Sequence, residues 1–482
     1  MTKRRRPGAL RGIAALGLSP LLAALLAGGM ATPAAAREST HATKPNIVVI
    51  YMDDFSPGAP QLWNDAERTP ALARFVNEGT WFASGSGSTP RCGPARGNTL
   101  TGRWSHNTGV TENDVGPYQP RMSVASKLQE RGYHTLFGGK YFNALRRHTP
   151  EEKMVERYAE SWDQFDPIWL NDGKFYDYPL WTRDGVERYG SNPRDHSTFV
   201  LTERMQQHIL DAPADEPIFA FLSLYDGHDP SLPLPRFEGA KECRGETWWG
   251  PAFNEEDVSD KPRHIRLHRL VDDEAYDLQT RCEEALTVDW ATGRIMKTLK
   301  ETGRLDDTVF VFTADNGWMM QEHRINDKKV PYSTPVPLYV HWPAQWADAP
   351  RQIDEPVSNV DLAPTFCDLA GCGIKHADGL SLLPLLDGET DALERTFVYE
   401  ESLHDKGLSP AWYGLRTTKA FDPEARWAYT EYSTGERELY DLITDPDQLD
   451  NRAGQAEFSG IEADLRKLLR RRVIKPDAVE FL

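Results

Sequence analysis

Polar residues of the kinds that bind metals and anions follow several apolar segments of this chain. Each residue alone has an ordinary explanation, because Asp and Asn are common in turns and helix caps, and a single Lys or His is usually solvated or hydrogen-bonded in a core. In open α/β sheets, however, ligands bind at the carboxyl ends of the strands. Taken together, these residues therefore predict one site at one edge of a sheet. They are Asp53 and Asp54 after NIVVIYM, Lys140 after HTLFGG, His228 after PIFAFLSLYDG, and Asp315 and Asn316 after TVFVFTA.

The predicted site combines oxygen ligands with cationic side chains. Carboxylate and amide oxygens are the ligands that Ca²⁺ or Mg²⁺ prefers, whereas zinc prefers sulfur and imidazole nitrogen. The sequence contains no H-E-x-x-H or C-x-x-C motif, and FGGKY lacks the first glycine and the Ser/Thr of a phosphate-binding loop. A cation beside Lys140, Arg96 and His228 would form a pocket for a tetrahedral oxyanion, with charge stabilised where it develops.

The five cysteines of the chain leave at least one without an intramolecular partner. Pairing Cys243 with Cys282 and Cys367 with Cys372 is one connectivity of several, and it spares Cys92. Cys92 lies in STPRCGPARGNTLTG, where prolines, glycines and an arginine predict an exposed loop. A lone cysteine is often a buried free thiol or an intermolecular linker. Because of the loop around it, we favour a chemically special residue instead.

The first 36 residues predict a secretory signal peptide. Five basic residues between Lys3 and Arg11 precede an apolar run from Ile13 to Met30, and Ala34 to Ala36 form an A-x-A cleavage site. A membrane anchor is disfavoured because this short run contains glycines and a proline. Signal cleavage predicts a secreted, extracellular or periplasmic protein without membrane attachment, and secretion permits disulfides. The absence of any N-x-[ST] sequon favours a bacterial origin.

The chain is strongly acidic. Its formal net charge is −18 at pH 7, and removal of the basic leader makes the remaining chain more acidic still. A surface this negative disfavours nucleic acids and anionic membranes as partners. An anionic substrate would have to be attracted by a few local cations.

Short β-rich segments alternate with helical patterns along most of the chain, which predicts an α/β fold with a largely parallel sheet. From about residue 390, strand-like segments follow one another without intervening helices, and IEADLRKLLRRR predicts a final helix. We therefore predict a signal peptide at 1–36, a catalytic domain at 37–388 and a C-terminal α+β subdomain at 389–482. The expected strands before that subdomain are 46–52, 134–137, 217–225 and 308–314, and the expected helices are 69–79, 123–132 and 272–303.

The chain resembles the type I sulfatases of the alkaline phosphatase superfamily. CGPAR followed by LTG is similar to the signature in which the cysteine is converted to formylglycine. Further motifs of the family match in order, namely PNIVVIYMDD, TPALARFVNEGTWF, GYHTLFGGKYFN, GHDP, FTADNG, EHRINDKKVPY and RELYDLITDPDQLDN. The resemblance runs from about residue 45 to about residue 475. It implies a large, mostly parallel sheet flanked by helices, with a smaller C-terminal antiparallel sheet plus a helix.

The resemblance implies a role for each residue of the predicted site. Oxygen-bearing residues and the modified cysteine would bind Ca²⁺, with Mg²⁺ as the alternative. The hydrated aldehyde offers two hydroxyls: one attacks sulfur, and the other then expels sulfate and restores the aldehyde, which an ordinary serine or cysteine could not do. The implied metal ligands are Asp53, Asp54, Cys92, Asp315 and Asn316, while Arg96 would hold the aldehyde hydrate, and Lys140, His228 and Lys328 would bind the sulfate.

Proton transfers are implied as well. Asp315 would be the base for the attack on sulfur, and His228 or Lys328 would protonate the leaving alcohol. Lys328 is preferred to Lys329 from its spacing to Tyr332.

The chain departs from the family pattern at several positions. Ala95 replaces the usual serine of the signature, and Arg91 and Thr99 occupy places where apolar residues are common. Modification is expected to survive, because the Cys, Pro and Arg of the signature are kept. Phe142 stands where many sulfatases carry a histidine, which leaves the proton acceptor for sulfate release unassigned. His106 in GRWSHNTG is a candidate for that role and for binding substrate, with a structural loop residue as the alternative.

The segments GGKYFN, WSHNTGV and FYDYPL resemble N-acetylglucosamine-6-sulfatases and related bacterial enzymes. We therefore expect a secreted sulfuric ester hydrolase that acts on sulfated sugars or glycosaminoglycan fragments and on aryl sulfates. Its partners would be this substrate and, during maturation, a formylglycine-generating enzyme. Two alternatives stay open: a phosphonate monoester or phosphodiester hydrolase on the same fold, and an unmodified, inactive relative that binds sulfated glycans.

Overall fold

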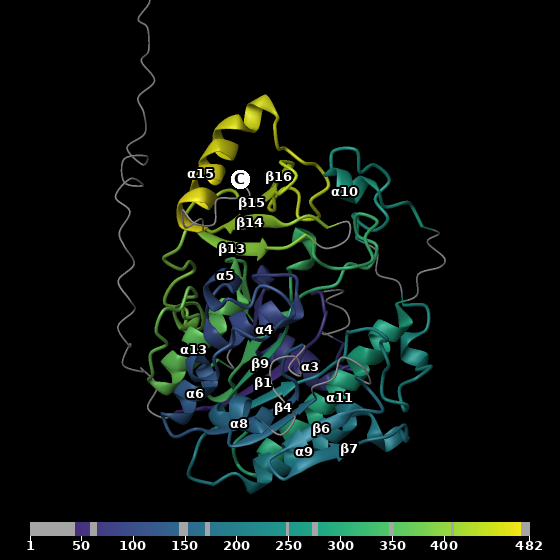
Figure 1. Ribbon diagram of the computed structural model, residues 1–482, viewed down its shortest axis with the longest axis vertical. Coiled ribbons are helices and arrows are strands. Elements are labelled where there is room, and N and C mark those ends of the chain that lie inside the picture. The colour runs from purple at the N-terminus through teal and green to yellow at the C-terminus, as the bar shows by residue number, and fades with distance from the viewer. Residues whose placement is uncertain are drawn as a thin grey trace, which may run out of the picture. The chain divides into compact units, whose positions relative to one another are not determined.

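The fold is given by a computed structural model (Figure 1), and the described residues belong to one compact unit, Ala36–Leu482. The predicted signal peptide, 1–36, lies outside the described residues. No helix within the described ranges has both the length and the apolar character needed to cross a bilayer. The structure describes residues 44–57, 65–143, 153–168, 174–246, 250–271, 278–346, 351–405 and 409–473.

A large sheet forms the centre of the unit. Its strand order is β11-β2-β10-β9-β1-β8-β4-β5-β6-β7. The central strands β9, β1, β8, β4 and β5 are mutually parallel, whereas β10, β6 and β7 pair antiparallel with their neighbours. The strands are β1 (Asn46–Met52), β2 (Thr80–Phe82), β4 (His134–Lys140), β5 (Gln164–Ile168), β6 (Pro179–Thr182), β7 (Gly185–Arg188), β8 (Ile218–Ser223), β9 (Thr308–Ala314), β10 (Leu338–His341) and β11 (Arg351–Ile353).

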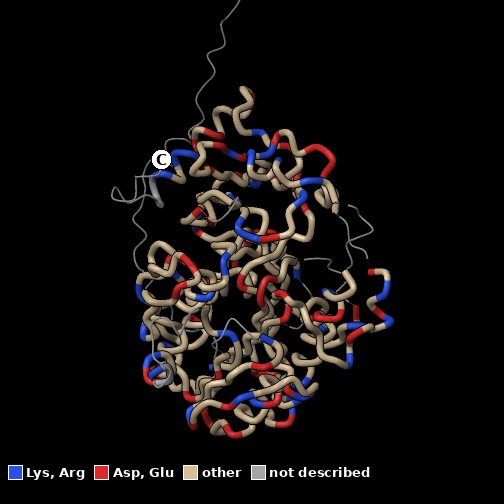
Figure 2. The backbone as a smooth tube through the Cα atoms, turned by 45° about the vertical axis from the view of Figure 1, so that its right-hand side comes forward, with Lys and Arg blue, Asp and Glu red and all other residues tan. Residues whose placement is uncertain are grey.

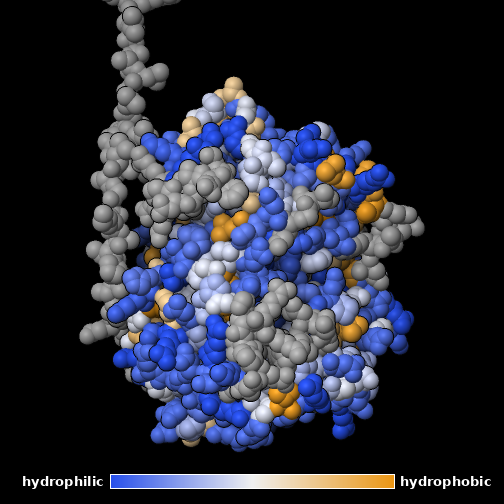
Figure 3. Space-filling view, in the orientation of Figure 1, coloured by the Kyte–Doolittle hydropathy of each residue, from blue (hydrophilic) through white to orange (hydrophobic). Residues whose placement is uncertain are grey.

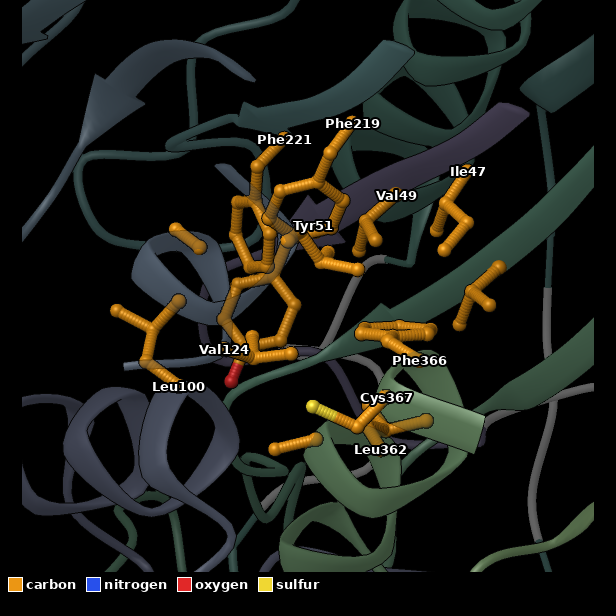
Figure 4. Packing of buried hydrophobic residues seen from close by; sticks show 14 of the residues in the cluster. Ile47, Val49, Tyr51, Leu100, Val124, Phe219, Phe221, Leu362, Phe366 and Cys367 are labelled. Atoms are coloured by element: carbon orange, nitrogen blue, oxygen red, sulfur yellow. The ribbon is translucent and has the colours of Figure 1, made fainter. Parts of the chain in front are cut away.

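Helices cover both faces of this sheet, which explains why its central strands are apolar throughout. All seven residues of β1 are buried, as expected for a parallel strand between two helical layers. Ile47, Val49 and Tyr51 pack on one face against α4 (Cys92–Thr101), α6 (Val124–Gln129) and α13 (Leu362–Ala370), as Figure 4 shows for part of this cluster. The opposite face packs against α3 (Pro70–Glu78), α9 (Ser197–Asp211) and α11 (Gln279–Glu301).

A smaller antiparallel sheet follows in the sequence, so the predicted fold class is confirmed. Its order is β13-β14-β15-β16, and Leu465 and Leu469 of the last helix pack in its apolar cluster. The predicted division between residues 388 and 389 stays a prediction. The elements are β13 (Phe397–Ser402), β14 (Trp412–Thr417), β15 (Trp427–Tyr432), β16 (Arg437–Asp441) and α15 (Ser459–Val473).

Short elements connect these layers. The strand β3 (Gly85–Ser86) pairs with β12 (Val357–Ser358) beside the main sheet. The visible face in Figure 3 is mostly hydrophilic, with separate apolar spots. The remaining short helices are α5 (Ser105–Thr108), α8 (Met154–Tyr158), α10 (Arg263–Arg266), α12 (Pro343–Trp346) and α14 (Leu383–Leu386).

The predicted elements are confirmed, with differences at their ends. The helix predicted over 272–303 begins at Gln279 among the described residues, since 272–277 lie outside them. Thr69 does not cap α3 with its side chain. Asp289 of α11 does so instead, because its Oδ1 accepts hydrogen bonds from the backbone N–H groups of Ala71 and Leu72, both at 2.8 Å.

The cysteine pairing is half confirmed. Cys243 and Cys282 form a disulfide, with 5.5 Å between their Cα atoms. The pairing predicted for Cys367 and Cys372 is wrong, because both are free thiols. Gly371, in the left-handed conformation, ends α13 and brings the N–H of Cys372 within 2.7 Å of the carbonyl of Cys367. The two thiols are hydrogen-bonded, and this bond together with burial raises the pKa of Cys367.

Candidate active site

The predicted site residues meet at the carboxyl ends of four adjacent strands. In the order β9-β1-β8-β4, each strand is a direct neighbour of the next. Asp53 and Asp54 follow β1, Asp315 and Asn316 follow β9, His228 lies in the loop after β8, and Lys140 is the last residue of β4. The parallel register therefore gathers these side chains at one edge of the sheet, as the sequence predicted.

Two lysines neutralise the two carboxylates that follow β1. Lys140 Nζ donates to Asp53 Oδ2, and Lys328 Nζ donates to Asp54 Oδ1. Burial alone would raise the pKa of Asp53, but Lys140 and His228 outweigh it and hold that pKa well below its usual range. Burial also opposes ionisation of Asp54, whose pKa is nevertheless lowered, chiefly by Lys328. Both carboxylates are therefore anionic, and both lysines have raised pKa values and stay charged.

Arg96 joins the ends of three strands. Its Nε donates to Asp315 Oδ2 at 3.0 Å, and its Nη2 forms an ion pair with the same oxygen at 2.9 Å. Its Nη1 donates to the carbonyl of Lys140 and to Ser223 Oγ, both at 2.6 Å. Burial and the charge of Asp53 raise the pKa of Asp315 to about 7, against the opposing effect of Arg96. This guanidinium thus fixes the positions of β4, β8 and β9 relative to the helix that carries it.

Cys92 is the first residue of α4, and the exposed loop predicted around it is wrong. Every residue of α4 is buried, and Cys92 is only 1% exposed. The glycine-rich sequence lets the helix approach its neighbours closely, and Pro94 is tolerated because it lies in the first helical turn. Cys92 Sγ lies 2.9 Å from Lys328 Nζ and 3.7 Å from Asp54 Oδ1. Burial raises the pKa of its thiol to about 12, although Lys140 and Lys328 act in the opposite direction.

Two glycines allow the strand ends to approach one another this closely. Gly139 has φ of 110°, and a Cβ there would lie 1.8 Å from the carbonyl oxygen of Ser223. Gly227 has φ of 104°, and a Cβ there would lie 2.1 Å from the carbonyl oxygen of Asp53. Any side chain at either position would displace the backbone of a strand that carries site residues.

Three buried oxygens in the cluster lack a hydrogen-bond donor within the part of the chain that the structure describes. They are Asp53 Oδ1, Asp54 Oδ2 and Asn316 Oδ1. Buried polar atoms without partners are rare in folded proteins, and their grouping calls for a cation. Ligand atoms of Asp53, Asp54, Cys92 and His228 lie within 4.8 Å of one another. The unpartnered oxygens, two from carboxylates and one from an amide, fit Ca²⁺ or Mg²⁺.

The structure adds one cation that the sequence did not indicate. Lys174 Nζ lies 2.9 Å from His228 Nδ1 and donates to the carbonyl of Asp229 at 2.6 Å. An ammonium group can only donate, so it leaves Nδ1 as the acceptor and places the imidazole proton on Nε2. That nitrogen faces Asp54, at 3.7 Å from Oδ2. Burial lowers the pKa of His228, so its neutral form is favoured.

Lys174 could not have been found from the sequence. It precedes FYDYPL, between Lys140 and His228 in the chain, and does not directly follow any strand predicted from the sequence. In the structure it is half-buried, and burial and Lys140 lower its pKa. Nothing in its sequence neighbourhood distinguishes it from a solvated surface lysine.

His106 and Phe142, two other positions singled out from the sequence, contact residues that hold the fold together. His106 N–H and Nδ1 both contact the buried carboxylate of Glu401, with Nδ1 at 2.9 Å from Oε2, and its ring lies against Trp104 and Tyr399. These contacts join α5 to β13, and the substrate-binding role of His106 stays a prediction. Phe142 is buried against Tyr118, with ring centroids 4.5 Å apart, and so serves the core.

Comparison with known proteins finds two family models, which together match most of the chain, and curated relatives that also match most of it. A family model described as Sulfatase matches residues 45–372, and one described as N-sulphoglucosamine sulphohydrolase, C-terminal, matches residues 321–475. A curated relative from Bacteroides thetaiotaomicron, named N-acetylglucosamine-6-O-sulfatase, is 24% identical over 93% of this chain and 89% of its own length.

Solved structures share the fold. One, titled as a complex with its substrate D-glucosamine-2-N,6-O-disulfate, has a TM-score of 0.74 at 22% identity and covers 89% of this chain and 97% of its own. The phosphonate monoester hydrolase of Agrobacterium radiobacter has a TM-score of 0.67 at 21% identity and covers 88% of this chain and 94% of its own. The fold by itself therefore does not separate sulfate from phosphonate esters.

Proposed function

This chain belongs to the sulfatase family and is a sulfuric ester hydrolase, and from that premise we propose that it releases inorganic sulfate from a sulfated amino sugar or glycosaminoglycan fragment through a formylglycine made from Cys92. The observation that carries the proposal is the position of Cys92. It begins a buried helix with its sulfur between Lys328 and Asp54, beside a cluster of carboxylates and cations. An unmodified thiol with a pKa of about 12 would be a poor nucleophile there, whereas a formylglycine hydrate would supply the attacking hydroxyl.

A divalent cation fits beside residue 92. We assign Asp53, Asp54, Asp315, Asn316 and residue 92 as its ligands. Asp53, Asp54 and Asn316 supply the unpartnered buried oxygens, and ligand atoms of Asp53, Asp54 and Cys92 lie within 4.8 Å of one another. Asp315 lies beside them, since its Oδ1 accepts hydrogen bonds from the backbone N–H groups of Asp54 and Asn316. When bound, Ca²⁺ would offset the carboxylate charge and stabilise negative charge on the reacting oxygens. His228 is excluded from this ligand set, because Lys174 holds its proton on the nitrogen that faces the site.

The cationic side chains would bind and orient the sulfate ester. Lys140 and Lys328 have their ammonium groups inside the cluster, where few water molecules compete for them. His228 Nε2–H faces the same cluster and can donate its proton toward the ester oxygen as the alcohol leaves. Arg96 holds the carbonyl of Lys140 and the carboxylate of Asp315, so it preserves the spacing between these groups.

A sulfated sugar is the substrate class that the comparisons support. The curated relative is named for N-acetylglucosamine-6-O-sulfate, and the similar solved structure is titled with a glucosamine disulfate substrate. Aryl sulfates are expected to react as well, since they carry the same ester group on a better leaving group. Maturation would require a formylglycine-generating enzyme as a partner.

The test is mass spectrometry of the peptide that contains Cys92, from protein co-expressed with a formylglycine-generating enzyme, together with sulfate release from 4-nitrophenyl sulfate and N-acetylglucosamine-6-sulfate. We expect the mass of the aldehyde or its hydrate, and turnover that Cys92→Ala abolishes. An unmodified thiol in a protein that binds sulfated glycans without releasing sulfate would favour the inactive glycan-binding alternative.

The similarity to a phosphonate monoester hydrolase gives a second candidate function. The two functions are separated by kcat/KM on matched 4-nitrophenyl sulfate and 4-nitrophenyl phenylphosphonate. Faster reaction of the phosphonate would replace our proposal with this alternative.

We also propose export of the protein after signal cleavage, as an extracellular or periplasmic bacterial enzyme. N-terminal sequencing of the secreted protein is expected to begin at Arg37. Retention of the leader would contradict this proposal.

A further inference from the structure

A polar pocket lies between helix α10 and the turn that joins β15 to β16. These elements lie in the upper part of Figure 1. Its volume is about 710 Å³, which is in the range of pockets that hold small ligands. Helix α10 contributes two arginines and a histidine, and the C-terminal sheet and its connections contribute carboxylates and hydroxyls. We call it the α10 pocket and define it by Arg263, His264, Arg266, Asp405, Ser433 and Glu436.

His264 is a buried polar side chain that lines this pocket without a partner. It is 8% exposed, and neither of its ring nitrogens forms a hydrogen bond with the described residues. Its ring packs on Tyr432, with centroids 4.9 Å apart. Burial lowers its pKa to about 4, so the neutral ring offers one donor and one acceptor. A ligand hydroxyl could therefore satisfy one of the two ring nitrogens, and a second polar group of the ligand the other.

The arginines place two cations beside the carboxylates Asp405 and Glu436 of the pocket lining, in a protein whose net charge is −18. Arg263 contacts Glu436 only through its backbone N–H, at 2.7 Å, and its guanidinium has no ion pair or hydrogen bond among the described residues. Arg266 Nη2 lies 3.9 Å from Glu436 Oε1, which is a weak contact. Both side chains are exposed and free to bind an anion. Guanidinium groups bind planar or tetrahedral anions such as carboxylate and sulfate in a two-pronged geometry.

Hydrogen bonds connect the walls of the α10 pocket to the candidate active site on two sides. Arg91, which precedes Cys92, donates from Nη2 to the carbonyl of His404 at 2.9 Å, and Asp405 is the next residue of the wall. Asp405 Oδ1 accepts a hydrogen bond from Ala411 N–H at 2.6 Å. The residue after Ala411 is Trp412, whose Nε1 donates to the carbonyl of Lys329, beside Lys328, at 2.8 Å.

These short hydrogen-bonded connections place the pocket wall at Asp405 near Cys92 and Lys328. A substrate longer than one sugar residue, with its reacting ester at residue 92, could reach it. The carboxylates of Asp405 and Glu436 add acceptors for sugar hydroxyls, and the arginines add cations for an acidic substituent.

We propose that the α10 pocket binds a second, anionic sugar residue of a sulfated oligosaccharide whose reacting ester lies at residue 92. Arg263 and Arg266 bind the sulfate or carboxylate of that residue, and His264 binds one of its hydroxyls. This inference rests on the proposed function. It also assigns a preference: the enzyme acts on oligosaccharides better than on single sugars.

The test compares two substrates in the mature enzyme. We expect the double variant Arg263→Ala/Arg266→Ala to lower kcat/KM for a heparin-derived tetrasaccharide by about tenfold or more, and to change kcat/KM for 4-nitrophenyl sulfate by less than about twofold. His264→Phe should give a smaller loss in the same direction. Equal effects on both substrates, or none on the tetrasaccharide, would overturn the proposal.

A matched control separates a local effect from a change in net charge. Arg188→Ala/Arg194→Ala removes the same charge from two exposed arginines at and beyond the outer strand β7. The tetrasaccharide should react nearly normally with this control. If the control loses as much activity as the α10 variant, the pocket is not the cause.

Failure of the proposed function is distinguishable from failure of this inference. A wild-type protein with formylglycine at residue 92 and no activity on 4-nitrophenyl sulfate would contradict the function but leave binding measurable. Isothermal titration of the tetrasaccharide into Cys92→Ala protein then tests the pocket alone. Weaker binding in the arginine variant supports the site, and unchanged binding rejects it.

Discussion

At the scale of single residues, Lys174 sets which ring nitrogen of His228 carries the proton. The ammonium group donates to His228 Nδ1 at 2.9 Å and thereby keeps a proton on Nε2. In Lys174→Met, Nδ1 would instead donate to the carbonyl of Asp229, also 2.9 Å away, and Nε2 would lose its proton. We expect kcat to fall by about tenfold to a hundredfold. The loss should grow as the leaving group becomes more basic, because poor leaving groups depend most on protonation.

This prediction is measured with a series of substituted aryl sulfates. A plot of log kcat against leaving-group pKa should become steeper in Lys174→Met than in the wild type. Lys174→Arg keeps a cationic donor and should recover part of the activity. A uniform loss over the whole series would mean that Lys174 acts only through packing or through the total charge of the site.

The carboxylate cluster predicts stabilisation by a divalent cation. Asp53, Asp54 and Asp315 bring buried carboxylate oxygens close together, and a bound cation would relieve their mutual repulsion. Ca²⁺ at a hundred times its Kd should raise the free energy of unfolding by about 2.7 kcal/mol. Thermal unfolding with and without Ca²⁺ measures this effect. Asp315→Asn should largely abolish the shift, whereas Glu187→Gln, an exposed change on β7, should keep it; an equal shift in Asp315→Asn would contradict the ligand assignment.

The sequence predicted most of the site, for a physical reason. Parallel strands present their carboxyl ends at the same edge, so Asp53, Lys140 and Asp315 could be grouped without coordinates. Lys174 was missed because a loop brings it to His228, and loop paths leave no periodic pattern. The sequence predicted an exposed loop around Cys92 because Gly and Pro are common in loops, but here they belong to the buried helix α4.

At the scale of elements, Asp289 shows how one helix organises another. Its Oδ1 accepts hydrogen bonds from Ala71 and Leu72 and so caps α3 from α11. Asp289→Ala should lower the free energy of unfolding by about 1–2 kcal/mol, because two N–H groups lose their acceptor. Asp289→Asn keeps an acceptor and should cost less at neutral pH. Urea unfolding of both variants checks this order, and an equal loss in both would show that the charge, not the acceptor, matters.

Asp289 also makes the free energy of unfolding depend on pH. Burial raises the pKa of Asp289 from 3.8 to about 6, so the folded state holds this proton more tightly than the unfolded state. This stabilisation is fully present below pH 3.8, the pKa in the unfolded state, and is lost as the pH rises through about 6, the pKa in the folded state. From pH 4 to pH 7, the wild type should therefore lose about 2 kcal/mol of unfolding free energy relative to Asp289→Asn. If the unfolding free energies of the two proteins changed in parallel with pH, this prediction would be contradicted.

Elements were predictable where apolar patterns are long and regular. The strand β1 and the helix α11 appear as expected, since one is a continuous apolar run and the other a long helical repeat. Thr69, the first residue of the helix predicted over 69–79, does not cap α3 with its side chain. Tertiary contact supplied Asp289 instead, from a position that no local pattern can connect with α3.

At the scale of the whole molecule, the charge of −18 opposes the approach of an anionic substrate. Acidic and basic residues are interspersed along the described backbone in Figure 2, so the negative excess belongs to the chain as a whole and not to one segment. The cations at the candidate active site and the α10 pocket act over short distances. Long-range repulsion and short-range attraction therefore respond differently to salt.

This difference predicts how the reaction depends on ionic strength. Between about 0.01 M and about 0.15 M salt, the Debye length falls from about 30 Å to about 8 Å, which screens the net charge but largely preserves contacts between buried groups. We expect kcat/KM for a heparin-derived tetrasaccharide to rise several-fold over this range. For 4-nitrophenyl sulfate, which carries one charge, the rise should be smaller. A steady fall for the tetrasaccharide would instead show that local cations dominate the field that a polyanionic substrate meets.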